Sequence, residues 1–172
     1  MKYVFIVIFI IVFLLFDTEL GYTNTSPLYT HLTYFFQHAS ILHLFLNSVS
    51  FIVMFTVLDK IIERKIFLSI TFSIGIVSSF LAMYDVPTVG ISSVIYAMIG
   101  LYIGVTVFYE DIRIADTRRY LLNISLIAIS LTISLIKTNS NFYIHIYSLV
   151  IGFIISLILS YLHNKRIKTS DD

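Results

Sequence analysis

The chain has 172 residues, of which 58% are hydrophobic and only 12% charged, and its formal net charge is +1. A soluble globular domain carries about 25% charged residues, so this composition is typical of an integral membrane protein. The length fits a single domain, and the small net charge offers no basic surface for nucleic acid. The absence of cysteine excludes disulfides and thiolate metal sites.

Six apolar runs predict six membrane-spanning helices. A spanning helix needs about 20 apolar residues, with a range of about 17–25, and five of the runs meet that length. The predicted helices cover about 3–21, 41–58, 66–84, 92–109, 120–136 and 142–162. We therefore expect an all-α membrane protein in which residues 1–172 form one transmembrane domain.

The first run is the shortest, because Asp17 follows residue 16. A full span must continue through Leu20 and Gly21, or the bilayer must become thinner there. A secretory signal peptide is the alternative, since Lys2 precedes an apolar core of suitable length. No small-x-small cleavage site follows in DTELGYTNTS, so we expect the segment to remain as a helix.

The basic residues predict the orientation of the helices, because cytoplasmic segments carry an excess of Lys and Arg. With a cytoplasmic N-terminus, ten of the eleven basic residues lie on the cytoplasmic side, and Lys137 lies outside. Both termini are then cytoplasmic. The cytoplasmic segments would be residue 2, 59–65, 110–119 and the tail from 163. The external loops would be about 17–40, 85–91 and 137–141.

Three predicted helices that are not consecutive carry polar residues at the same depth, near their external ends. His43 and Asn47 are four residues apart and share a face of the second helix, as Ser92 and Tyr96 do on the fourth. His145 lies at the external end of the sixth helix. Polar groups inside a bilayer are costly, so they indicate either helix packing or a functional site.

Small residues on the fourth and sixth helices would let these two helices approach closely. They recur at every fourth position: Gly100 and Gly104 on one helix, and Ser148, Gly152 and Ser156 on the other. If the two faces meet, His145 can reach Ser92.

That meeting would create a serine hydrolase site. A serine hydroxyl is a poor nucleophile until a base within hydrogen-bond distance takes its proton, and His145 could be that base. Ser92 opens a helix, where free N–H groups and the positive end of the dipole favour negative charge. His43 and Asn47 could donate hydrogen bonds to an oxyanion.

Each signal alone also has a structural explanation. A serine at a helix start is usually an N-cap, and Asn47 alone is a typical interhelical contact. A single histidine near a helix end is often interfacial, and Tyr96 alone is an aromatic ring filling a core. Only the coincidence of these residues at one depth indicates a site.

Three segments resemble the rhomboid family of intramembrane serine proteases. They are LTYFFQHASILHLFLN at 32–47, GISSVIYAMIG at 90–100 and HIYSLVIG at 145–152. Each resembles one family motif, and together they follow the family's order along nearly the whole chain. The residues that match the motifs are His38, His43, Asn47, Gly90, Ser92, Tyr96, Ala97 and His145.

The resemblance implies a six-helix rhomboid-like bundle with a Ser92–His145 catalytic dyad and no acidic third member. It implies that His43, Asn47 and the Ser92 main-chain N–H stabilise the oxyanion, and that Tyr96 packs against the His145 ring.

Supporting roles follow from the same resemblance. Gly90 would allow a close backbone approach, and His38 would bond the backbone of the first external loop. Glu63 and Arg64 resemble the family's charged inner loop.

The chain departs from the family pattern at several positions. Ser93 replaces the glycine that follows the nucleophile, so it either crowds the site or is itself the nucleophile. Ser148 replaces a glycine one turn after the histidine, which widens the helix contact slightly. Tyr29 and Thr30 replace a Trp-Arg pair, which puts the anchoring of the first external loop in doubt.

The function implied is that of a serine endopeptidase cleaving single-pass membrane proteins near the outer membrane face. Its partners would be such substrates and the lipid bilayer, and by analogy it would reside in a bacterial inner membrane. We expect no cofactor and no metal.

The sequence leaves several alternative functions. The first is a non-catalytic rhomboid-like protein that binds membrane clients. A haem carrier using His43 and His145 would need further intramembrane histidines. A zinc protease lacks an HExxH motif, and a transporter would show more intramembrane charge.

Overall fold

The computed structural model describes residues 1–17, 19–82, 84–108, 125 and 141–170. The helices within these ranges are α1 (Lys2–Leu15), α2 (Thr30–Thr33), α3 (Ile41–Leu58), α4 (Arg64–Leu81), α5 (Ser92–Phe108) and α7 (Phe142–Ser170). No β-strand occurs among the described residues, where one isolated antiparallel bridge joins Tyr22 and Thr88. Apart from residue 125, the predicted helix 120–136 lies outside these ranges.

Most helix bounds lie close to the apolar runs of the sequence. Helix α3 has the predicted range, and Ser40 caps its start by accepting a hydrogen bond from the His43 N–H. Helix α4 begins two residues before the predicted start at 66 and ends at Leu81 instead of 84. Helix α7 continues to Ser170, eight residues past the predicted end. The polar segment HNKRIKTS therefore belongs to the helix, although the apolar run ends at 162.

The predicted continuation of the first helix to Gly21 is wrong. Helix α1 ends at Leu15, and Phe16 has extended backbone angles of φ −126° and ψ 143°. The Leu20 N–H donates to the Gln37 side-chain oxygen at 2.8 Å, and Gly21 packs tightly against Val89. These residues satisfy their backbone through loop contacts instead of a helix.

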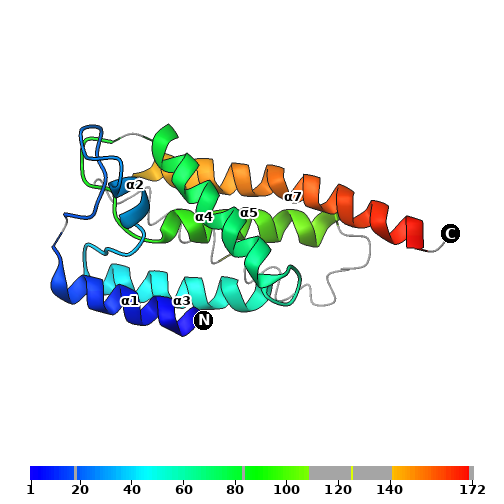
Figure 1. The fold of residues 1–172 in the computed structure, drawn as a ribbon, viewed down its shortest axis with the longest axis horizontal. Helices are drawn as coiled ribbons and strands as arrows, with labels where there is room; N and C mark the ends of the chain where they lie inside the picture. Colours follow the sequence, from blue (N-terminus) through cyan, green and yellow to red (C-terminus); the bar gives the residue numbers. More distant parts are fainter. Residues whose placement is uncertain (18, 83, 109–124, 126–140, 171–172) are drawn as a thin grey trace.

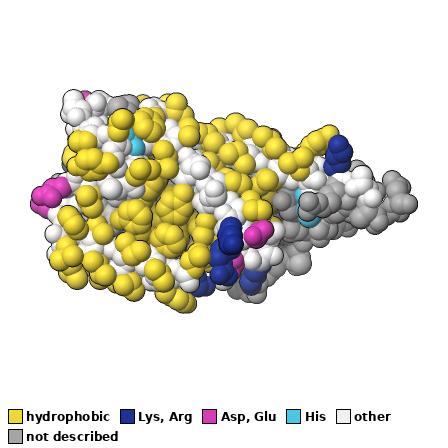
Figure 2. Space-filling view, in the orientation of Figure 1, with side chains coloured by type: hydrophobic (Ala, Val, Ile, Leu, Met, Phe, Trp, Pro, Cys, Tyr) yellow, Lys and Arg dark blue, Asp and Glu magenta, His cyan; other side chains and the backbone are white. Residues whose placement is uncertain are grey.

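The chain is an integral membrane protein. Helices α3 and α4 and the Phe142–Lys165 part of α7 are long and apolar enough to cross a membrane, while α1 and α5 are shorter apolar helices. Figure 2 shows a surface that is largely hydrophobic, with Lys and Arg side chains gathered on one side of it. The six spans and the cytoplasmic termini stay predictions.

Helices α3, α5 and α7 begin at the same end of the molecule, which we call the loop end (Figure 1). The described residues of the segments 16–40 and 82–91 lie there too, and they include the short helix α2. Helices α1 and α3 lie side by side along one edge of the bundle, and α5 and α7 run next to each other.

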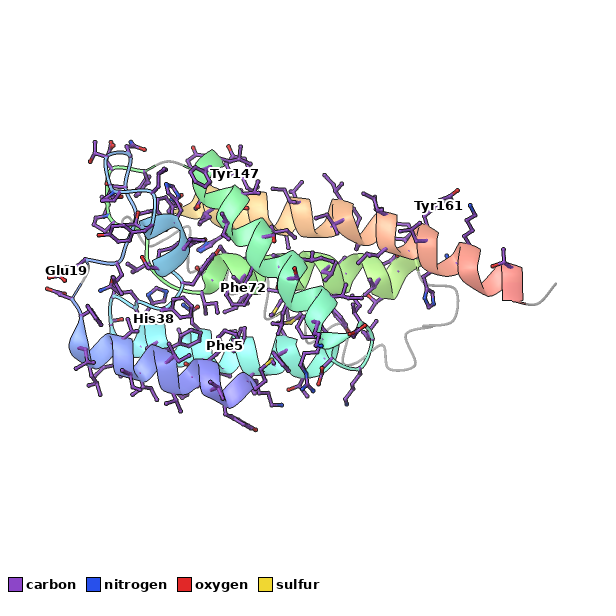
Figure 3. All side chains as sticks on the ribbon, viewed as in Figure 1. Phe5, Glu19, His38, Phe72, Tyr147 and Tyr161 are labelled. Atoms are coloured by element: carbon purple, nitrogen blue, oxygen red, sulfur yellow. The ribbon has the colours of Figure 1, made fainter. Side chains whose placement is uncertain are left out.

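Aromatic side chains fill the space between α1, α3 and α4. Phe5 stacks on Phe72 with ring centroids 5.6 Å apart, and its edge meets Phe51 at 5.4 Å (Figure 3). Phe9 is fully buried and contacts Phe5 and Phe51. Such pairs add about 0.5–1.5 kcal/mol each beyond the area they bury. This cluster fixes α3, which carries His43 and Asn47.

Helices α5 and α7 are in backbone contact along a line of small residues, which we call the seam: Gly100, Gly104, Gly152 and Ser156. A Cβ atom added at Gly100 would lie 2.1 Å from the Leu149 carbonyl oxygen, and one at Gly152 would lie 2.4 Å from the Ala97 oxygen. Gly104 faces the Ser156 side chain. The predicted meeting of these two faces is confirmed, and it brings the helix carrying Ser92 against the helix carrying His145.

Candidate active site

The start of α5 and the first turn of α7 place a serine next to a histidine. The Ser92 Oγ lies 2.9 Å from the His145 Nε2, which is a hydrogen-bond distance. His145 is 8% exposed and Ser92 is half-buried, so the pair is shielded on most sides but accessible at the serine. The contact joins residues 53 positions apart and depends on the seam beneath it.

Tyr96 supports one face of the histidine ring. The Tyr96 and His145 rings are stacked, with centroids 4.5 Å apart and an angle of 26° between their planes. Because Tyr96 lies one turn after Ser92 on α5, one helix presents both the hydroxyl and the ring that His145 contacts. A stacked ring restricts rotation of the imidazole and keeps the Nε2 atom turned toward Ser92.

Gly90 lies against two polar side chains of α3. Its φ of +109° is a conformation that side chains rarely adopt. An added Cβ atom would lie 2.8 Å from the His43 ring and 3.0 Å from the Asn47 Nδ2. A larger residue would therefore push His43 and Asn47 away from the backbone just before Ser92.

The Asn47 amide is a buried hydrogen-bond donor beside the start of α5. Asn47 is 8% exposed, and its Nδ2 makes no hydrogen bond to any described residue. A buried donor without a partner is costly, and its presence needs an explanation. A negatively charged oxygen formed beside Ser92 would supply an acceptor for it.

The expected backbone contact of His38 in the first external loop stays a prediction. The ring is buried, 4% exposed, and packs against Phe9 and, in a T-shaped contact, against His43, at centroid distances of 5.3 and 5.2 Å. Neither ring nitrogen makes a well-formed hydrogen bond within the described part of the chain. Burial, and then His43, lower the pKa of His38 to about 3, against an opposing effect of the Phe36 backbone. The His38 ring is thus neutral at ordinary pH and lies between Phe9 and His43.

Ser93 points away from the histidine. It is fully buried, and its Oγ lies 2.7 Å from the Tyr34 hydroxyl, on the side of α5 that faces α4. The hydroxyl that lies within hydrogen-bond distance of His145 belongs to Ser92. The two serines of the sequence motif therefore face different partners, and the alternative with Ser93 as nucleophile loses its geometric basis.

A polar cluster at the loop end holds the first turn of α7, and the sequence analysis missed it. The Asn141 Nδ2 lies 2.8 Å from the Ala82 carbonyl oxygen, 3.0 Å from the Thr88 Oγ1 and 3.1 Å from the Tyr22 hydroxyl. The Tyr22 and Thr88 backbones also bond each other in both directions. Asn141 precedes His145 by one helical turn, and Thr88 precedes Ser92 by four residues. The cluster thus links the two chain segments that lead to Ser92 and to His145.

The loop of residues 16–40 is anchored without the Trp-Arg pair. The His31 Nδ1 bonds the Ser79 Oγ at 2.8 Å, and its ring stacks on Phe80 at 4.0 Å. Burial lowers the pKa of His31, which favours the neutral ring. Tyr29 is largely exposed, and Thr30 is buried and bonds the Pro27 carbonyl. Stacking on α4 replaces the expected anchor.

At the opposite end of α3 and α4, Arg64 forms an ion pair within the charged loop. Its guanidinium donates two hydrogen bonds to Asp59, at 2.8 and 2.7 Å. This hydrogen-bonded pairing lowers the pKa of Asp59. Arg64 is exposed and Asp59 is half-buried, so the pair stabilises the turn locally.

The site combines the groups that acyl transfer requires, which are a hydroxyl, a ring nitrogen that can take a proton, and donors for a negative charge. Within the described ranges, no group of three or more His, Asp or Glu side chains is placed to hold a metal ion.

Comparison with known proteins adds two findings. Residues 25–162 match the family model for the rhomboid domain. The chain is also 25% identical over 149 residues to the Bacillus subtilis (strain 168) protein named "Putative rhomboid protease YdcA", covering 83% of this chain and 74% of that protein. The matched range contains Ser92, His145, Tyr96, His43, Asn47 and Gly90, while Tyr22 of the polar cluster lies before it.

Proposed function

The chain belongs to the rhomboid family, and from this we propose that it is an intramembrane serine endopeptidase with a Ser92–His145 dyad. The observation that carries the proposal is the 2.9 Å contact between the Ser92 Oγ and the His145 Nε2. Family membership alone would also fit a relative that binds membrane proteins without cutting them. The nucleophile–base contact favours the enzyme.

In the proposed first step, the Ser92 Oγ attacks the carbonyl carbon of the scissile peptide bond and its proton passes to the His145 Nε2. The tetrahedral intermediate bears its negative charge on the former carbonyl oxygen. It collapses as the C–N bond breaks, and His145 returns the proton to the leaving amine. Water then hydrolyses the acyl-enzyme by the same sequence of proton transfers and restores Ser92.

Three donors are available for the oxyanion in this scheme. The Asn47 Nδ2 is buried and makes no hydrogen bond to any described residue, and His43 lies beside it against Gly90. The first N–H groups of α5 have no intrahelical acceptor, and the helix dipole favours negative charge there. Removing one such donor from a serine protease costs about 10²–10³ in kcat.

We propose that the substrates are single-pass membrane proteins cut near the outer membrane face. The site lies at the loop end, at the start of helices that are apolar enough to sit in lipid. An intact helix hides its carbonyl groups, so substrates should carry helix-weakening residues near the cut. The relative from Bacillus subtilis is consistent with a bacterial plasma membrane as the location.

The test uses the full chain in liposomes with a single-pass substrate whose outer segment contains a helix breaker. We expect Ser92→Ala to abolish cleavage and His145→Ala to reduce it by about 10²–10⁴-fold. Ser93→Ala should retain clear activity. A fluorophosphonate probe, which reacts with activated serines, should label the wild type and not Ser92→Ala.

A different outcome would change the assignment. If the wild type cuts none of several substrates and also resists the fluorophosphonate, the client-binding alternative replaces the protease. Cleavage that survives Ser92→Ala but not Ser93→Ala would move the nucleophile by one residue.

A further inference from the structure

Tyr34 contacts the chain on both sides of the candidate nucleophile. It follows α2, is 1% exposed, and lies between α4 and the start of α5. Its main-chain carbonyl accepts a hydrogen bond from the Gly90 N–H at 2.8 Å. Its hydroxyl lies 2.7 Å from the Ser93 Oγ and 2.9 Å from the Gly75 carbonyl oxygen. One residue thus holds positions 90 and 93, which flank Ser92.

The donor and acceptor roles in this arrangement are fixed. The Gly75 carbonyl can only accept, so the single proton of the Tyr34 hydroxyl is donated to it. The Ser93 hydroxyl must then donate its own proton to the Tyr34 oxygen. Burial raises the pKa of Tyr34, so the tyrosine keeps its proton and its donor role at ordinary pH.

The arrangement needs the space left by Gly75. A Cβ atom added there would lie 2.7 Å from the Phe35 ring and 3.2 Å from the Ser93 Oγ. Ser92 and Ser93 are neighbours on a helix, so their side chains point about 100° apart: Ser93 toward α4 and Ser92 toward α7. A bond that fixes Ser93 therefore also fixes the rotation of the first turn of α5, which aims Ser92 at His145.

We propose that Tyr34 and Ser93 are positioning residues that hold Ser92 in register with His145, so that the serine in place of the family's glycine is part of the working site. This inference rests on the proposed protease function. A glycine at position 93 would have no hydroxyl to pair with Tyr34. We call Tyr34 and Ser93 the clamp. Neither residue touches the reacting atoms, and both act through the backbone of residues 90–93.

A double-mutant cycle tests the inference in liposomes with the single-pass substrate. The variants are Tyr34→Phe, Ser93→Ala and the double variant, with Tyr29→Phe as an exposed tyrosine control. The kcat is expressed per active site, with the active sites counted by fluorophosphonate titration. This readout separates positioning from a simple loss of folded protein, which lowers the number of sites but not the turnover of each.

We expect each single variant to lower kcat per titrated site about tenfold with little change in KM, because Ser92 loses its alignment with His145. Residues in one network are coupled, so the double variant should be no slower than either single variant. The control Tyr29→Phe should equal the wild type. Losses that multiply to about a hundredfold in the double variant would overturn the shared clamp. An unchanged kcat per site in Ser93→Ala would overturn it too, and that result decides the matter if Tyr34→Phe does not fold.

The outcome for the wild type separates the two proposals. A wild type that neither cuts nor labels removes the protease function and the clamp with it. An active wild type whose variants keep full turnover removes the clamp alone.

Discussion

The seam between α5 and α7 and the polar cluster at the loop end hold the same two helices together by different means. Along the seam, Gly100 and Gly152 have no side chains, and the backbones touch. At the loop end, Asn141, Thr88 and Tyr22 are joined by directional hydrogen bonds. The seam sets how closely the helices approach. The cluster sets their rotation and their position along the axis.

This difference shows why both regions are needed for a 2.9 Å contact between Ser92 and His145. Close packing without polar contacts tolerates sliding of one helix along the other, since small residues make a smooth surface. Hydrogen bonds without close packing leave the helices too far apart. The predictions below act on one region or the other, in order of decreasing effect.

Gly100→Leu should break the seam. The first added carbon would meet the Leu149 carbonyl oxygen at 2.1 Å, and a backbone atom cannot move aside cheaply. We expect a loss of more than about 4 kcal/mol in the free energy of unfolding and no cleavage. Thermal unfolding in detergent measures the first and the liposome assay the second. Val107→Leu, at an exposed position of the same helix, is the control and should behave as wild type.

Asn141→Ala should weaken the cluster but leave the seam intact. It removes the amide that donates to oxygens of Ala82, Thr88 and Tyr22. We therefore expect a loss of about 2–3 kcal/mol in the free energy of unfolding and a lower kcat. Asn141→Asp should be worse, because it places an acceptor against the Ala82 carbonyl. Glu19→Ala, which truncates an exposed side chain at the same end of the molecule, is the control. If Asn141→Ala keeps full kcat, the cluster does not align the site.

Acid should destabilise the loop end more than the seam. His38 has a pKa of about 3 in the folded protein and about 6.5 when unfolded, so the unfolded chain binds more protons below pH 6.5. Stability should therefore fall as pH decreases, by about 2 kcal/mol between pH 6.5 and pH 5. His38→Gln, followed by thermal unfolding across this range, should flatten the slope. An equal slope in both proteins would contradict the assignment.

Ser148→Ala should have the smallest effect, and it should be favourable. Ser148 is fully buried on α7, and its Oγ makes no hydrogen bond to any described residue. Removing such a group avoids its desolvation cost, so we expect a gain of about 0.5–1 kcal/mol with activity unchanged. A loss of stability would mean that the hydroxyl has a partner outside the described residues.

The residues that a sequence pattern could reveal are those whose partners recur at helical spacing. Apolar runs located α3, α4, α5 and α7, and the four-residue spacing of glycine and serine located the seam. Ser92 and His145 could be paired because both lie at the same depth on helices that carry small residues. The prediction that the first helix continues through Gly21 was wrong, because apolar length alone does not show that loop contacts compete for the same backbone groups.

Tyr34 and Asn141 gave no such signal. Tyr34 meets Gly75 and Ser93 across 41 and 59 positions, and Asn141 meets Tyr22 across 119. Both look like ordinary loop residues in the sequence. Their roles depend on which loops fold over the helix ends.

The sequence by itself determined the class of the protein, the extent of most helices and the chemical groups of the site, because burial in lipid imposes long apolar runs and makes every polar residue within them conspicuous. Only the tertiary structure decided which serine faces the histidine and what holds it there. Those outcomes depend on the rotation of α5 about its axis, which is set by hydrogen bonds between segments distant in the chain.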